Sequence, residues 1–191
     1  MSTGAPGRPV AAVRAAATGR PAPRRDGPRL PRGARRTLNC VHAVISTAWL
    51  GAHAAVVVLL AIGLAADTPE RAGTGYGAAE MLMTGFTRPA GFAALATGLL
   101  LAVTTPWGLF RHYWVFGKLL LTAALVVGGN LSLTPAVRAM AAATEGGTVL
   151  PPSDERLALL VPLCVSLGFL VAATVLSLLK PFGRVRWRQP G

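Results

Sequence analysis

The hydrophobic pattern of the chain is dominated by four long apolar runs, at residues 41–66, 81–104, 113–133 and 157–179. Each run is rich in Leu, Ala and Val, and each reaches the length of about 20 residues that an α-helix needs to cross a hydrocarbon core. The pattern therefore predicts an all-α fold, a membrane four-helix bundle that occupies residues 37–183.

Two local features modify this pattern. Arg88-Pro89 is predicted to interrupt the second helix, because proline lacks an N–H and its ring clashes with the preceding turn. We expect the Arg88 guanidinium to reach the headgroups or to pair with Glu80. The Ala-rich residues 136–144 are expected to continue as a short helix on the outer surface. Small residues below Arg88 favour close packing on a neighbouring helix: Ala90, Ala94 and Gly98.

The N-terminal segment, residues 1–36, contains nine Arg among Pro, Ala and Gly, with no apolar period. Such a segment buries too little apolar surface to offset the entropy lost on ordering, so we predict a disordered, basic cytoplasmic tail. A second basic tail is predicted at residues 184–191. The run that follows residue 40 is too long to be the apolar part of a signal peptide.

The basic residues of the chain give an orientation. With both termini in the cytoplasm, that side receives 15 of the 19 Lys and Arg residues, and six of the seven acids fall outside. Cytoplasmic flanks of membrane helices carry this excess of positive charge. The net charge of +12 is therefore a signal of topology, and because it is spread over flanks it does not indicate a nucleic-acid partner. The predicted partner is the lipid bilayer, together with another membrane protein or a second copy of this chain.

Composition agrees with a membrane location. Only 14% of the residues are charged and the mean hydropathy is +0.51, whereas soluble domains carry about 25% charged residues. Arg outnumbers Lys by 17 to 2, which is typical of a GC-rich bacterial genome. We therefore expect a multi-pass protein of the bacterial plasma membrane.

Polar side chains in the first run recur every three or four residues and so share one helix face. Because polar groups facing lipid are costly, this face is expected to turn towards the other helices as a polar interior face. Its members are Asn39, His42, Ser46, Trp49 and His53.

The histidines suggest a cofactor. His42 and His112 begin the first and third helices on the same side of the membrane, so their imidazoles lie at similar depth. Two histidines on different helices can ligate a b-type haem between them, with Lys118 or Arg111 near a propionate. The alternative is that each His bonds a neighbouring helix or a headgroup, and that the Lys118 ammonium reaches the phosphate layer. His53 lies deeper and has no histidine partner there.

The sequence lacks the residues on which coupled transport and enzymatic catalysis usually depend. Apart from Glu80 at the outer edge, no carboxylate lies within the four runs, although cation-coupled transporters usually keep one there. No nucleophile elbow, zinc-protease motif or phosphate-binding loop is present. Neither Cys40 nor Cys164 has a second cysteine or a histidine at the spacing of zinc ligands. We therefore predict no metal site, and from the missing motifs no catalytic residues.

Several segments resemble a known family: His42 with Trp49-Leu50-Gly51, Pro89, Thr97-Gly98-Leu99-Leu100, and Thr105-Pro106-Trp107-Gly108-Leu109-Phe110-Arg111-His112-Tyr113-Trp114 running into Lys118-Leu119. Residues 38–140 look like an uncharacterised family of small four-helix bacterial integral membrane proteins, a domain of unknown function. The resemblance implies the four-helix topology and supplies no activity. The first helix is also similar to that of copper-resistance D-type membrane proteins, but no Met-rich or additional His cluster accompanies it, so no metal role is carried over.

Three functions follow as hypotheses. The first is a non-enzymatic structural or accessory component of the membrane. The second is a b-type haem electron-transfer module that uses His42 and His112. The third is a permease for a small solute or a metal, which would use the polar interior face of the first helix.

Overall fold

The structure, a computed structural model, describes residues 30–104 and 113–179. Within these residues the chain forms helices and no strand. Four helical spans are long and apolar enough to cross a membrane, which confirms the predicted all-α, membrane-spanning class. The tails at residues 1–29 and 184–191 lie outside the described residues, and so does the predicted cytoplasmic loop 105–112 with His112.

The four spans comprise several elements, and the first and last are single helices, α2 and α7. The second span joins α3 and α4 through a π-turn, η1, and the third joins α5 and α6 through a second π-turn, η2. Their bounds are α2 Arg32–Leu64, α3 Pro69–Leu82, η1 Met83–Thr87, α4 Arg88–Thr104, α5 Tyr113–Gly128, η2 Gly129–Leu133, α6 Thr134–Ala143, the 3₁₀ turn η3 Glu145–Gly147 and α7 Ser153–Leu179.

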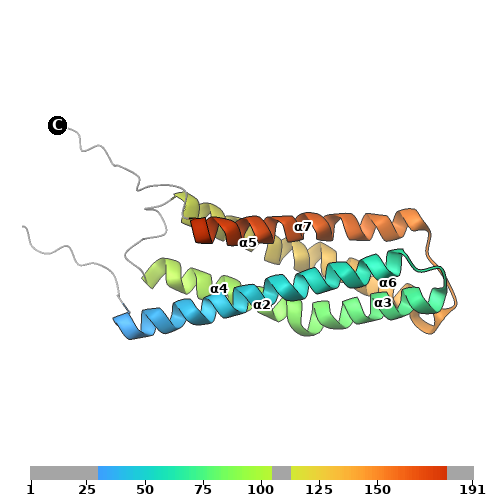
Figure 1. Cartoon of the computed structure of the whole chain (residues 1–191), viewed down its shortest axis with the longest axis horizontal. Coiled ribbons are helices and arrows are strands. Elements are labelled where there is room, and N and C mark those ends of the chain that lie inside the picture. The colour runs from blue at the N-terminus through green and yellow to red at the C-terminus, as the bar shows by residue number, and fades with distance from the viewer. Residues whose placement is uncertain (1–29, 105–112, 180–191) are drawn as a thin grey trace, which may run out of the picture.

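The spans run up and down along one bundle axis (Figure 1). The start of α2 and the end of α7 lie at one end of the bundle, which we call the tail end, together with the end of α4 and the start of α5. The α2–α3 and α6–α7 connections lie at the opposite end, which we call the loop end. Both described ends of the chain therefore lie at the same end of the bundle.

Helix α2 begins earlier than predicted, at Arg32 instead of residue 41. Residues 32–36, which were predicted to belong to the disordered tail, are therefore helical, and that part of the prediction is wrong. The apolar part of α2 supplies the helix nucleus, and Arg and Ala extend it at little cost because both are good helix formers. Pro31 stands at the N-cap position, where its missing N–H breaks no helical bond.

The second span is also longer than the apolar run at residues 81–104, because α3 begins at Pro69, twelve residues earlier. Its start carries recognisable signals: the Thr68 hydroxyl accepts from the Arg71 N–H, Pro69 opens the first turn and Glu70 lies within it. These residues stabilise a helix whose sequence is too polar and Gly-rich to be found by hydropathy. Helix α7 likewise begins at Ser153, four residues before its run, with Asp154 and Glu155 in its first turn.

The regular α-helix of the second span is interrupted next to Pro89, as predicted, and the interruption is a π-turn that does not end the span. The Arg88 N–H bonds the Met83 carbonyl in the π-turn η1, and the helix continues through Pro89. The wider turn gives the proline ring space where a regular α-turn would produce a clash. The third span repeats this solution: the Thr134 N–H bonds the Gly129 carbonyl in η2, immediately before Pro135. The predicted short helix at residues 136–144 is therefore α6, continuous with the third span.

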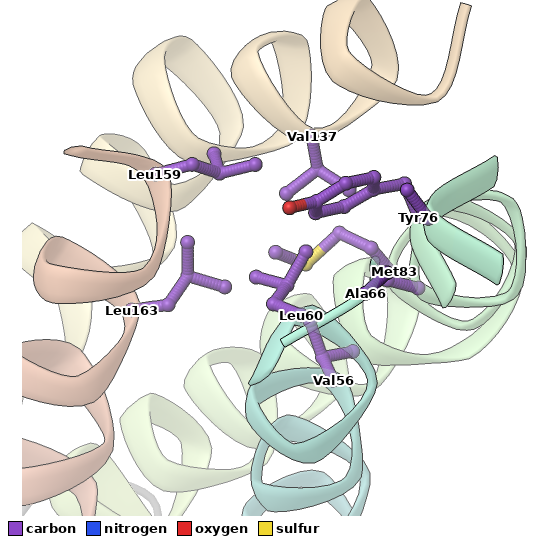
Figure 2. Close-up of a cluster of buried hydrophobic side chains, with 10 residues drawn as sticks. Val56, Leu60, Ala66, Tyr76, Met83, Val137, Leu159 and Leu163 are labelled. Carbon is purple, nitrogen blue, oxygen red and sulfur yellow. The ribbon is translucent and has the colours of Figure 1, made fainter. Parts of the chain in front are cut away.

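The largest cluster of buried apolar side chains lies near the loop end, where Tyr76 is 0% exposed (Figure 2). Helices α2 and α3 cross closely there, because a Cβ added at Gly75 would lie 3.0 Å from the Gly63 nitrogen and the Leu59 carbonyl oxygen. Figure 2 shows members of this cluster from α2, α3, η1, α6 and α7. It comprises Val56, Leu60, Ala66, Ala72, Tyr76, Ala79, Met83, Val137, Leu159 and Leu163.

A second cluster lies nearer the tail end and contains Trp49, Ala94, Val126 and Leu170. Small residues of α4 receive the large side chains of α2 here. A Cβ at Gly91 would lie 3.1 Å from the Trp49 ring, and one at Gly98 would lie 3.1 Å from the His42 ring. The contact face of α4 thus includes Ala94 and Gly98, as predicted, with Gly91 as an additional member.

Candidate functional site

The polar face of α2 is progressively more buried from the tail end towards the middle of the bundle. Asn39 is exposed, and His42 and Ser46 are half-buried. Trp49 and His53 are buried, with 7% and 6% of their surface exposed. The bundle interior therefore receives the deeper members of this face, and Asn39 remains on its surface.

His42 bonds a threonine of α4. Its Nδ1 lies 2.8 Å from the Thr97 hydroxyl, and that hydroxyl donates to the Ala93 carbonyl of its own helix at 2.7 Å. A threonine hydroxyl has a single hydrogen, so His42 Nδ1 must be the donor. This bond fixes the tautomer of the imidazole and leaves a lone pair on Nε2.

His53 repeats the arrangement with α7. Its Nε2 lies 2.7 Å from the Ser166 hydroxyl, and Ser166 donates to the Leu163 carbonyl at 2.9 Å. The Leu163 carbonyl oxygen is also 3.4 Å from His53 Nε2. By the same reasoning, Nε2 carries the hydrogen and Nδ1 carries the lone pair.

Lys118 follows the same pattern between α5 and α7. Its ammonium donates to the Ser177 hydroxyl, which donates in turn to the Ala173 carbonyl at 2.7 Å. Lys118 is half-buried and lies within electrostatic range of His42. The lysine therefore has a partner inside the protein, in addition to the headgroups that the sequence suggested.

Three hydroxyls thus act in the same way, and we call Thr97, Ser166 and Ser177 the back-bonded hydroxyls. Each donates its hydrogen to a carbonyl of its own helix and accepts an N–H from a different helix. Sequence reasoning identified the three donors, His42, His53 and Lys118, but missed the acceptors. A hydroxyl inside an apolar helix was the available signal, because such a group needs a partner in the membrane interior.

Arg156 is a further residue that sequence reasoning missed. Only 9% of it is exposed, and its Nη1 donates to the carbonyls of Gly63, Leu64 and Ala66 at 3.2, 2.9 and 3.1 Å. The first two carbonyls belong to the last turn of α2 and the third follows its C-cap residue, Ala65. Helical partners run out at this end and partial negative charge accumulates there. Arg156 therefore caps α2 from the start of α7.

An open groove of about 590 Å³ lies near the loop end of the bundle, between α3, α6 and η3. Glu80 lies in it and accepts from Arg138 Nε of α6 at 3.4 Å. Of the two alternatives predicted for Arg88, the headgroups or Glu80, the second is not observed: Glu80 instead joins α3 to α6 through Arg138. Glu70 and Glu145 also line the groove.

Of the predicted haem residues, the structure places His42 and Lys118 in the same region, whereas His112 lies outside the described residues. Within residues 30–104 and 113–179, no three His, Cys, Asp or Glu side chains are grouped to hold a metal ion. Cys40 and Cys164 are both exposed and free.

Comparison of the chain with models of protein families, with curated proteins and with solved structures gives no match. The resemblance of residues 38–140 to a family of small four-helix membrane proteins therefore stays a prediction.

Proposed function

We propose that this chain is a structural or accessory component of the bacterial plasma membrane, without catalytic activity of its own. The back-bonded hydroxyls carry the proposal. The groups best suited to chemistry, His42, His53 and Lys118, each use an N–H to join one helix to another. Inside a membrane such bonds hold helices together where no hydrophobic effect between helices is available.

The surface of the bundle suits a component that meets other membrane-embedded partners. Large apolar side chains are exposed along every span, for example Val58, Phe92, Leu120 and Val165. Lipid tails or the helices of another membrane protein can cover such a surface. Both termini are placed in the cytoplasm in this proposal, supported by the excess of positive charge on that side.

The accessory function predicts a stable assembly. When membranes are solubilised with a mild detergent, the protein is expected in a particle that contains more than one 19.7 kDa chain, either with a second protein in fixed ratio or as a homo-oligomer. Native mass spectrometry measures this directly. A population made of lone monomers at the lowest detergent concentration would contradict the proposal.

Alkaline phosphatase fused after residue 150 should be active and after residue 110 inactive, which tests the orientation.

A b-type haem module is the second candidate, and the hydrogen bond between His42 and Thr97 favours it. Haem iron binds the unprotonated nitrogen of an imidazole, whose other nitrogen usually donates to a protein acceptor. His42 has this arrangement, with Nδ1 engaged and Nε2 free to ligate. Lys118, within electrostatic range of His42, could neutralise a propionate.

This candidate predicts a coloured protein. Material purified from haem-replete cells should show a Soret band that shifts on reduction with dithionite. His42→Ala should abolish the band, because an axial ligand is lost, whereas His53→Ala should retain it, because His53 bonds Ser166 through Nε2 in a different part of the bundle. A colourless wild-type preparation would rule the module out.

A further inference from the structure

A small pocket of about 40 Å³ lies between the spans, where the two π-turns approach α2 and α7. Its lining includes buried His53 and Ser166, already joined to each other, and buried Trp49. The residues of η1 and η2 complete it, among them Thr87 and Asn130. The pocket is thus formed by all four spans.

Two polar atoms at this pocket lack a partner among the described residues: Thr87 Oγ1 and Asn130 Oδ1. Thr87 is only 3% exposed, so bulk water does not reach its hydroxyl. The Asn130 amide nitrogen donates to the Val126 carbonyl at 2.8 Å. Its side-chain oxygen, Oδ1, is therefore the amide atom that has no hydrogen-bond partner. Buried groups of this kind are nearly always paired with protein or with ordered water, because leaving them unpaired is costly.

The two π-turns bring these atoms to the same pocket. Thr87 is the last residue of η1 and Asn130 is the second residue of η2. A π-turn contains more residues than an α-turn, so it changes the direction of the side chains that follow, and such turns occur frequently at functional sites. Both π-turns of the described residues line this same pocket.

The size of the pocket limits its ligand. One water needs about 10–15 Å³ of this kind of volume, so the pocket has room for about three waters and excludes haem and most metabolites. Its chemistry is equally restrictive. No carboxylate lines it and Arg88 does, which disfavours a cation, while Asn130 Oδ1 can only accept a hydrogen bond, which disfavours an anion.

We propose that this pocket is an internal hydration site, in which ordered water bridges Thr87 and Asn130 between the second and third spans. Water can donate to Asn130 Oδ1 while it donates to or accepts from Thr87, so it matches the mixed donors and acceptors of the lining. His53 also lines the pocket, and its Nδ1 keeps a lone pair because Nε2 donates to Ser166. Arg88, which is exposed, provides a polar rim.

Radiolytic footprinting of the full chain in lipid nanodiscs tests the proposal. Hydroxyl radicals form from water where it lies, so they oxidise reactive side chains beside bound water even when bulk solvent is excluded. Met83 and Trp49 line the pocket and are buried. Leu60 is 1% exposed, does not line the pocket and has no polar atom in its side chain, so it serves as the internal control. Relative to the reactivity of each free amino acid, we expect rapid oxidation of Met83 and Trp49 and none of Leu60; equal protection of all three would overturn the proposal.

Substitution provides a second measurement. Thr87→Val keeps the shape of the side chain and removes the hydroxyl, so in a hydrated pocket it should lower the thermal midpoint and reduce oxidation of Met83. In a dry pocket the same change would remove an unpaired polar group, and the midpoint would rise. Thr84→Val is the matched control, since Thr84 lies in the same turn but does not line the pocket; it should leave the oxidation of Met83 unchanged. A rise in the midpoint of Thr87→Val would also overturn the proposal.

Discussion

Replacement of Gly63 by alanine is expected to lower the free energy of unfolding by about 2 kcal/mol. A Cβ at this position would lie 2.6 Å from Cζ of Tyr76, whose ring is completely buried and cannot swing away. Overpacking of this kind costs about 3 kcal/mol, and the better helix propensity of alanine returns about 1 kcal/mol. Thermal or denaturant unfolding in detergent measures the difference.

Gly51→Ala is the control for this prediction. Gly51 belongs to the same helix, is exposed, and has no atom within 4 Å of an added Cβ, so its replacement should leave stability unchanged or slightly higher. A double variant localises the cause. Tyr76→Leu shortens the opposing side chain, and the loss caused by Gly63→Ala should be smaller in that background. Equal losses in both backgrounds would show that the Tyr76 ring is not the obstacle.

Replacement of Arg156 by methionine is expected to destabilise the bundle by about 3 kcal/mol. Arg156 donates to three carbonyls at the end of α2, and a buried acceptor that loses a charged donor costs about 1–3 kcal/mol. Methionine fills similar volume, so the loss reports mainly on the hydrogen bonds. The same unfolding measurement applies, and α2 should fray at the loop end, as faster hydrogen exchange near Leu64.

Arg71→Met is the matched control for Arg156. Its ion pair with Asp67, at 3.0 Å, is exposed on both sides, and exposed pairs contribute less than about 1 kcal/mol. Arg156→Lys should recover only part of the stability, because an ammonium cannot reproduce the planar fork of the guanidinium. Should Arg156→Met prove as mild as Arg71→Met, the cap would be unimportant to stability.

The membrane-spanning class could be predicted from sequence because apolar length alone decides it. The boundaries of the helices could not. Helix α3 lies outside the apolar run and is specified by its start, Thr68-Pro69-Glu70, a local signal that a hydropathy pattern does not register. Helix α2 extended into the basic tail because arginine is a good helix former once a nucleus exists.

The candidate site could be predicted only in part, and for a physical reason. Periodicity placed His42 and His53 on one face of α2, since that is a property of a single helix. Their partners, Thr97 and Ser166, depend on how each other helix is rotated about its axis, and this is decided by packing between helices. The cap formed by Arg156 escaped for the same reason, since 92 residues separate it from Leu64.

The π-turn η1 has a consequence for how the length of the second span can vary. Twelve residues separate buried Ala79 from buried Gly91, and in an uninterrupted helix of 3.6 residues per turn they would point about 120° apart. With the extra residue that a π-turn contains, both still face the interior of the bundle. Such turns are equivalent to a one-residue insertion, so loss of one residue between Met83 and Thr87 would restore a regular helix and leave the buried faces of the two halves in phase. Relatives of this chain that are one residue shorter in the second span should therefore lack that residue here, with the buried positions of α3 and α4 unchanged.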